Sequence, residues 1–384
     1  MQEPRDSSAG DHESNPVEDQ PADGPTSPVG QTSREHPTAA PVTDNDEAVR
    51  DDQTESEAGG RSTSVWRTVG KWSLVAVGVL VVIALLLATV PVSSGGLDAR
   101  PDPTADYDDA IERFADVTAD EAELGVIDAC RSRRFVHGER TEVAVVLYHG
   151  LTNCPQQFVD LAEELHSAGS NVIIMRAPYH GLGNEDGVIA GVTAVGPLSA
   201  HDLRDFADDS VDIAVGLGDR VEVLGLSMGG VLAMWTAEFR DDVDLVVALA
   251  PAISIPRVPH FLTTAMINIF NRLPNFSLPS AGTKLDHAYA GESTGALAAM
   301  FLLAQATENE LSSGRVAGAD EVIVVLNPDD DQVDNGEVTQ LVERWSDGDG
   351  EVEIIVLDTD GLPHDLIDPA QPEGDVDQVY PLLF

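Results

Sequence analysis

Residues 221–230 read VEVLGLSMGG, and this stretch decides the fold that the chain is expected to adopt. An apolar, β-type run ends in Gly225-x-Ser227-x-Gly229, and a helix-capable segment, 231–239, follows at once. A strand, a sharp turn and a helix in this order are typical of a nucleophile elbow, which raises a serine hydroxyl above a sheet. The alternative is a serine that only caps the helix. Because of its position between strand and helix, we predict that Ser227 is a nucleophile.

Apolar strands alternate with amphipathic helices on both sides of this stretch. Strands are expected at 142–148, 171–175, 243–249, 321–326 and 351–357, and helices at 157–168, 200–217 and 338–345. This alternation predicts an α/β fold with a mostly parallel sheet flanked by helices. Residues 133–137 and 142–148 are also expected to form a hairpin around Gly138. Prolines and apolar runs replace the alternation at 251–315, which predicts an inserted helical cap.

The N-terminal third is expected to contain a tail, a membrane anchor and a linker. Residues 1–64 are acidic and hold almost no large apolar side chains, which predicts a disordered tail. Residues 73–90 form an uncharged apolar run long enough to span a bilayer, so the anchor is expected at 65–92. A linker at 93–124 and the main domain at 125–384 follow.

The orientation of the anchor is predicted from the residues that flank it. Basic residues and tryptophans precede the run, namely Arg61, Trp66, Arg67, Lys71 and Trp72, whereas no basic residue follows before Arg100. The positive-inside rule then predicts a single-pass protein with a cytoplasmic N-terminus and an extracellular main domain. A cleaved signal peptide is the alternative, but a long segment precedes the run and no A-x-A-like site stands out.

The charge of the chain limits its partners and its host. The formal net charge is −46, and Lys71 and Lys284 are the only lysines. Acidic residues spread along the whole chain predict a surface that stays hydrated in concentrated salt, and therefore a halophilic host. Nucleic acid is excluded as a partner by this sign of charge.

Two cysteines, Cys130 and Cys154, are present. An extracellular domain permits a disulfide between them, and two separate buried thiols are the alternative. Their spacing in the sequence leaves the two possibilities open.

A serine nucleophile requires a base, and the base requires a carboxylate to orient it. His364 follows the last predicted strand, at the sheet edge that faces the elbow. The loop 327–333 after the preceding strand supplies the acid: Asp331 is favoured by its distance from the strand end, and Asp330 is second. A solvated acidic loop is the alternative, and the spacing does not match a calcium-binding loop, so no metal is expected.

Backbone N–H groups are expected to stabilise the negative charge that develops on a substrate oxygen. The N–H of Met228, directly after the nucleophile, is one candidate. The N–H of Leu151, in the loop that follows strand 142–148, is the other. His149 and His180 are expected to be structural.

The chain resembles the α/β-hydrolase superfamily in five places: His149-Gly150-Leu151-Thr152, Pro178-Tyr179-His180-Gly181, Gly225–Gly230, the Asp331 loop and His364. The nearest resemblance is to the lysophospholipase, monoacylglycerol lipase and serine aminopeptidase-like group, over about residues 125–384. It implies an eight-stranded sheet, a cap and a serine that cleaves esters or amides. Pro328 stands where that group usually has glycine, and the anchor and tail lie outside the pattern.

These observations predict a membrane-anchored serine hydrolase that cleaves carboxylic esters, including lipid-like ones, through an acyl-enzyme and without a cofactor. A peptidase or amidase is the alternative enzyme, and a non-catalytic binding protein on the same fold is the alternative of another class. The apolar side chains of residues 261–270 in the cap are expected either to line an acyl pocket or to pack on the sheet.

Overall fold

The computed structural model describes residues 62–256, 258–279, 285–313, 317–346 and 351–383. The tail predicted at 1–64 lies outside these residues apart from Ser62–Ser64. Where helices and strands were expected in the remainder, the structure has them, with ends that differ by a few residues.

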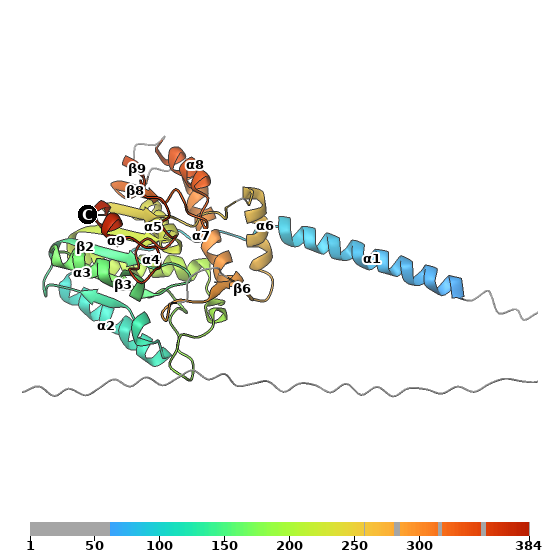
Figure 1. Cartoon of the computed structure of the whole chain (residues 1–384), viewed down its shortest axis with the longest axis horizontal. Coiled ribbons are helices and arrows are strands. Elements are labelled where there is room, and N and C mark those ends of the chain that lie inside the picture. Colours follow the sequence, from blue (N-terminus) through green and yellow to red (C-terminus); the bar gives the residue numbers. More distant parts are fainter. Residues whose placement is uncertain (1–61, 257, 280–284, 314–316, 347–350, 384) are drawn as a thin grey trace, which may run out of the picture. The chain divides into compact units, whose positions relative to one another are not determined.

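Seven strands form the main sheet in the order β1-β3-β2-β4-β5-β8-β9 (Figure 1). All neighbours are parallel except β1 and β3. The strands are β1 (Arg133–Phe135), β2 (Thr141–Tyr148), β3 (Asn171–Met175), β4 (Gly218–Leu226), β5 (Leu245–Leu249), β8 (Glu321–Leu326) and β9 (Glu351–Val356). Among the described residues the sheet therefore has seven strands, not the eight that the resemblance implied.

The predicted hairpin between 133–137 and 142–148 is wrong. β1 pairs with β3, and β2 lies between β3 and β4 with parallel partners on both sides. The reason lies in the two strands themselves. β2 is apolar throughout its buried half and suits the interior of a sheet, whereas Arg133 and Arg134 suit the edge strand that β1 forms.

Helices flank the sheet as the alternation predicted. They are α3 (Val159–Ser167), α4 (Ala200–Leu217), α5 (Met228–Phe239) and α8 (Asn335–Ser346). Helix α4 begins with a capping box, in which Ser199 and Asp202 exchange hydrogen bonds. Helix α5 is buried along its whole length and packs against β4 and β5, so the turn that precedes it is anchored to the sheet.

The apolar run near the N-terminus lies in helix α1 (Ser62–Thr89). Residues Lys71–Thr89 are apolar and long enough to cross a membrane, and large side chains such as Trp72, Leu74 and Leu80 are exposed. A signal sequence passes the same test of length and composition. The helix is therefore a candidate membrane span by length and composition, and these two properties are shared by anchors and signal sequences.

Residues predicted to be a linker pack into the domain. Leu97 belongs to the main core together with Ala110 and Phe114 of helix α2 (Tyr107–Leu124). The indole of Trp235 donates a hydrogen bond to the carbonyl of Leu97. The hydrophobic core therefore begins at Leu97 and not at residue 125.

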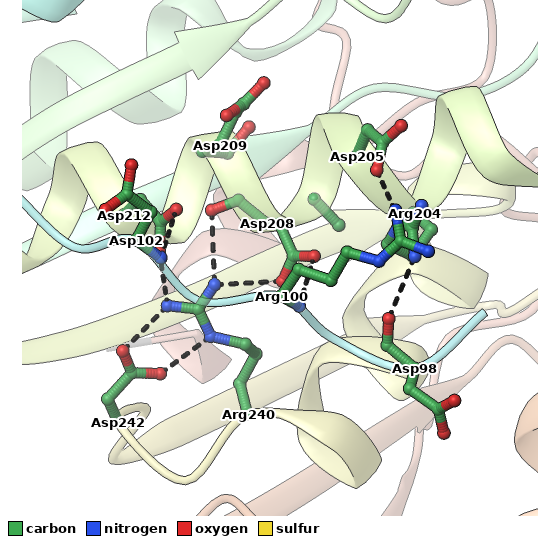
Figure 2. A network of polar contacts seen from close by, with 12 residues as sticks. Asp98, Arg100, Asp102, Arg204, Asp205, Asp208, Asp209, Asp212, Arg240 and Asp242 are labelled. Carbon is green, nitrogen blue, oxygen red and sulfur yellow. Dashed lines mark hydrogen bonds and ion pairs between the residues drawn. The ribbon is translucent and has the colours of Figure 1, made fainter. Parts of the chain in front are cut away.

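A buried ionic network holds the segment 96–104 against α4 (Figure 2). The guanidinium of Arg240 is fully buried and contacts the carboxylates of Asp208, Asp212 and Asp242 at 2.7–3.0 Å. Burial lowers the pKa of Arg240, but the hydrogen bonds and charges of Asp242 and Asp212 outweigh burial and raise it, so Arg240 stays charged. Asp208 and Asp212 also accept hydrogen bonds from the backbone N–H groups of Arg100 and Asp102.

The cap contains helices α6 (His260–Phe270) and α7 (Thr294–Ser313) and the short strands β6 (Ser277–Pro279) and β7 (Gly291–Ser293). Cys130 and Cys154 are joined by a disulfide, with their Cα atoms 5.1 Å apart. The disulfide resolves the alternative left open by the sequence and ties the loop 149–155 to the segment before β1.

Candidate active site

Ser227 occupies a strained turn between β4 and α5. Its backbone has φ 60° and ψ −110°, in the region that non-glycine residues rarely adopt. The glycines around it allow the turn to close: a Cβ on Gly225 would collide with Gly229, and a Cβ on Gly229 would collide with the carbonyl of Tyr148. The predicted elbow geometry is therefore present, and Ser227 lines a cavity.

His364 lines the same cavity, and its carboxylate partner is Asp330. The distance between His364 Nδ1 and Asp330 Oδ2 is 2.7 Å, and the Asp330 carboxylate is buried. The prediction of Asp331 as the partner is therefore corrected by one residue. Asp330 turns inward because its other oxygen accepts hydrogen bonds from the N–H groups of Gln332 and Val333, while Asp331 lines the cavity.

The two loops that carry this pair are joined directly. The side-chain amide of Asn327, at the end of β8, donates hydrogen bonds to the carbonyls of Leu362 and Pro363. Burial by itself lowers the pKa of His364, but the hydrogen bond and charge of Asp330 outweigh burial, with help from the charges of Asp365 and Asp331. The pKa of His364 is therefore raised above its ordinary value.

The cavity has a volume of about 730 Å³ and is partly open to solvent. One wall is apolar and comes from α7, through Leu297, Met300 and Phe301. Among the described side chains, none from α6 lines the cavity, so the cavity gives no support to an acyl pocket formed by residues 261–270. Helix α6 instead packs against α7. An amphipathic pattern in the cap could not show which of two apolar helices faces the cavity.

Another part of the cavity lining is polar and includes residues that the sequence did not single out. Asp365 is half-buried next to His364 in the chain, and it accepts hydrogen bonds from Asn153 and Gln371. Burial raises the pKa of Asp365 and also that of Glu292, another carboxyl that lines the cavity. The position of Asp365, directly after the predicted base, was the one sequence signal that could have identified it.

The histidines predicted to be structural contact backbone groups. His149 Nε2 accepts a hydrogen bond from the N–H of Ala177, and its Nδ1 lies 2.8 Å from the carbonyl oxygen of Gly150. His180 contacts the carbonyl oxygens of Pro178 and Leu151. Burial lowers the pKa of His149 well below its ordinary value and that of His180 to about 4, so both rings are neutral at pH 7.

The two predicted oxyanion donors belong to Met228, which follows Ser227 in the chain, and to Leu151, which lines the same cavity as Ser227. Met228 is the first residue of α5, so the helix leaves its N–H without an intrahelical acceptor. Leu151 lines the cavity, and its N–H meets no acceptor among the described residues. Its loop is held by Gln157, which accepts from the N–H of Gly150, and by His180. The loop also passes near the serine, because a Cβ built on Gly150 would lie 3.7 Å from the Cβ of Ser227.

Three comparisons place this geometry among known proteins. The family model described as "Serine aminopeptidase, S33" matches residues 139–290. A thermostable monoacylglycerol lipase of Bacillus sp. (strain H-257) is 29% identical over 127 residues, which are 33% of this chain and 48% of that protein. The match thus spans about half the length of the relative.

The third comparison is structural. A structure of the metagenome-derived lipolytic enzymes LipS and LipT aligns with a TM-score of 0.52 and 21% identity, over 67% of this chain and 97% of that one. At this identity the similarity shows the fold alone. The family match contains Leu151 and Ser227 but ends before the loops of Asp330 and His364, whose assignment therefore depends on geometry.

Proposed function

Since the chain belongs to the serine aminopeptidase S33 and monoacylglycerol lipase-like family of α/β-hydrolases, we propose that it is a serine hydrolase that cleaves carboxylic esters. The observation that carries the proposal is one cavity lined by both a serine on a strained elbow and a buried histidine that contacts a buried carboxylate. Ester hydrolysis is preferred over amide hydrolysis because the curated relative is a lipase.

In the proposed mechanism, neutral His364 accepts the proton of the Ser227 hydroxyl as its oxygen attacks the substrate carbonyl. Asp330 holds the ring and stabilises the imidazolium that results. The N–H groups of Leu151 and Met228 donate to the oxyanion. His364 then returns the proton to the leaving alcohol, and a water molecule releases the acid from Ser227 by the same steps.

The test is labelling of the full chain by a fluorophosphonate probe, together with hydrolysis of p-nitrophenyl butyrate in concentrated salt. We expect wild type to be labelled and active, and Ser227→Ala to lose labelling and about four orders of magnitude or more of activity. A binding protein would show neither property in the wild type. Faster turnover of aminoacyl p-nitroanilides than of the ester would favour the peptidase alternative.

We further propose that α1 anchors the enzyme in the membrane and that the catalytic domain is extracellular. Support comes from the length and composition of residues 71–89 and from the Cys130–Cys154 disulfide, which persists in oxidising compartments. The acidic surface supports a halophilic host. Protease added to intact cells should degrade the domain and spare the N-terminal tail, and the reverse pattern would reverse the topology.

A further inference from the structure

The cap and the anchor share a sequence property that separates them from the rest of this acidic chain. The chain has 67 acidic residues, yet none occurs at 58–97 or at 245–285, and these are its two longest stretches without Asp or Glu. The second stretch carries three basic residues, Arg257, Arg272 and Lys284. A segment of local positive charge in a chain of net charge −46 is suited to an anionic surface.

The same two stretches are in contact. The side-chain amide of Asn268, buried on α6, donates to the carbonyl of Ala88 at 3.0 Å and accepts from the N–H of Val92 at 2.8 Å. Arg272, directly after α6, donates to the carbonyls of Leu87 and Pro91. Because Leu87 and Ala88 belong to the last turn of α1, the cap supplies acceptors and donors where that helix ends.

This contact determines how far the cap lies from a bilayer. Residues Lys71–Thr89, 19 in all, span about 28 Å as a helix, close to the thickness of the hydrocarbon layer. The last turn of α1 would then lie at the boundary between hydrocarbon and headgroups. Helix α6, which contacts that turn, would lie at the same level.

The exposed side chains of the cap fit such a position. Leu262, Leu273 and Phe276 are each 43–44% exposed although they are large and apolar. Phe276 precedes β6, whose last residue, Pro279, lines the active-site cavity. Helix α6 packs on α7, which forms the apolar wall of the same cavity. Leu262 therefore lies on a helix that packs on the cavity wall, and Phe276 lies three residues before a residue that lines the cavity.

We propose that the cap surface formed by Leu262, Leu273 and Phe276 lies in the lipid surface beside the end of α1, and that the cavity receives its ester from that surface. The inference rests on the proposed ester hydrolysis and on α1 as a membrane span. The partner is a lipid bilayer containing anionic headgroups, which basic and apolar residues together recognise.

The first test measures contact with lipid and does not depend on hydrolysis. The chain's only cysteines form the disulfide, so a single introduced thiol can be labelled specifically. Full-length Leu273→Cys, carrying an environment-sensitive fluorophore, is reconstituted in vesicles of equal parts phosphatidylcholine and phosphatidylglycerol with nitroxide-labelled lipid. We expect strong quenching, and little quenching for Leu124→Cys on exposed α2. Equal quenching at both positions, or none at Leu273→Cys, would overturn the proposal.

The second test measures substrate entry. A triple variant, Leu262→Ser with Leu273→Ser and Phe276→Ser, is compared with a control that removes exposed apolar side chains elsewhere, Leu124→Ser with Val188→Ser and Leu382→Ser. We expect the cap variant to hydrolyse a long-chain ester held in the vesicles about tenfold more slowly, with soluble p-nitrophenyl butyrate changed by less than about twofold. The control should change neither rate.

The outcomes separate the two proposals. If wild type hydrolyses the soluble ester and the cap variant keeps the same ratio of the two rates, the surface inference fails and the proposed function stands. If wild type hydrolyses neither ester, the proposed function fails, and the quenching at Leu273→Cys still decides whether the cap contacts lipid.

Discussion

Two clusters in this molecule place a basic side chain against aspartates, and they differ in what surrounds them. His364 meets one buried carboxylate, that of Asp330, and its ring lines a cavity open to solvent. Arg240 meets three carboxylates in a closed interior and is fully buried. Imidazole can lose its proton near neutral pH, whereas guanidinium cannot. The comparison teaches that the cavity and the titratable group, not the ion pair itself, distinguish a candidate catalytic site from a structural one.

The largest expected effect is at the carboxylate of the first cluster. Asp330→Asn should lower kcat for ester hydrolysis by about four orders of magnitude, because the amide no longer orients and stabilises the imidazolium. Asp331→Asn, the matched control in the same loop, should retain kcat within about tenfold. Steady-state kinetics on p-nitrophenyl butyrate measure both. If the Asp331→Asn variant is the inactive one, the contact at 2.7 Å is not the functional one.

A smaller effect, on stability rather than activity, is expected at the second cluster. Arg240→Met should lower the free energy of unfolding by about 3–5 kcal/mol, because buried carboxylates lose their partner. Denaturant titration measures the loss, and active-site titration with a fluorophosphonate should show unchanged kcat per folded molecule. An Arg240→Met variant with unchanged stability but a lower kcat would contradict the assignment of a structural role to this cluster.

The pH dependence of that variant has a definite sign. Burial raises the pKa of Asp208 and of Asp212 above the ordinary value, so protonation favours the folded state over the unfolded one. Without the guanidinium, which lowers both carboxyl pKa values, these pKa values rise further in the folded state. The stability difference between wild type and Arg240→Met should therefore shrink as the pH falls toward the carboxyl pKa values.

The smallest effect is on the acid limb of the pH profile. In the proposed mechanism activity needs neutral His364, whose pKa is raised by Asp330 first and by the charges of Asp365 and Asp331 after it. The kcat/KM of wild type should therefore fall already at a pH above the ordinary histidine pKa. Asp331→Asn should move this limb slightly to lower pH, whereas Arg240→Met should leave it in place. A limb unmoved in Asp331→Asn would show that His364 does not set it.

Much of the fold and part of the site could be predicted from local patterns. The elbow around Ser227, the alternation of strands and helices, and the position of His364 each depend on neighbouring residues in the chain. The choice between Asp330 and Asp331 depends on which carboxylate the loop turns inward. The number of residues from the strand end cannot distinguish two neighbouring aspartates, and Pro328, in place of the usual glycine, makes the loop harder to align with the family.

Other features depend on contacts between distant segments. The segment after helix α1 has the sequence of a solvated acidic spacer, yet its backbone N–H groups bond to Asp208 and Asp212, whose charges Arg240 neutralises from another element. The pairing of β1 with β3 and the disulfide also join segments that are distant in the sequence. Composition describes such segments by their average polarity, whereas their burial is decided by a few specific partners.

The packing of Leu97 and of the segment 96–104 sets where the chain can be shortened. A version without helix α1 that starts at residue 125, where the family resemblance begins, would lack Leu97 and the N–H groups of Arg100 and Asp102 that bond to Asp208 and Asp212. It would expose apolar core and buried carboxylates together, and would be expected to aggregate. A version that starts at about residue 93 keeps the segment whole, and is the form of the enzyme that we expect to crystallise.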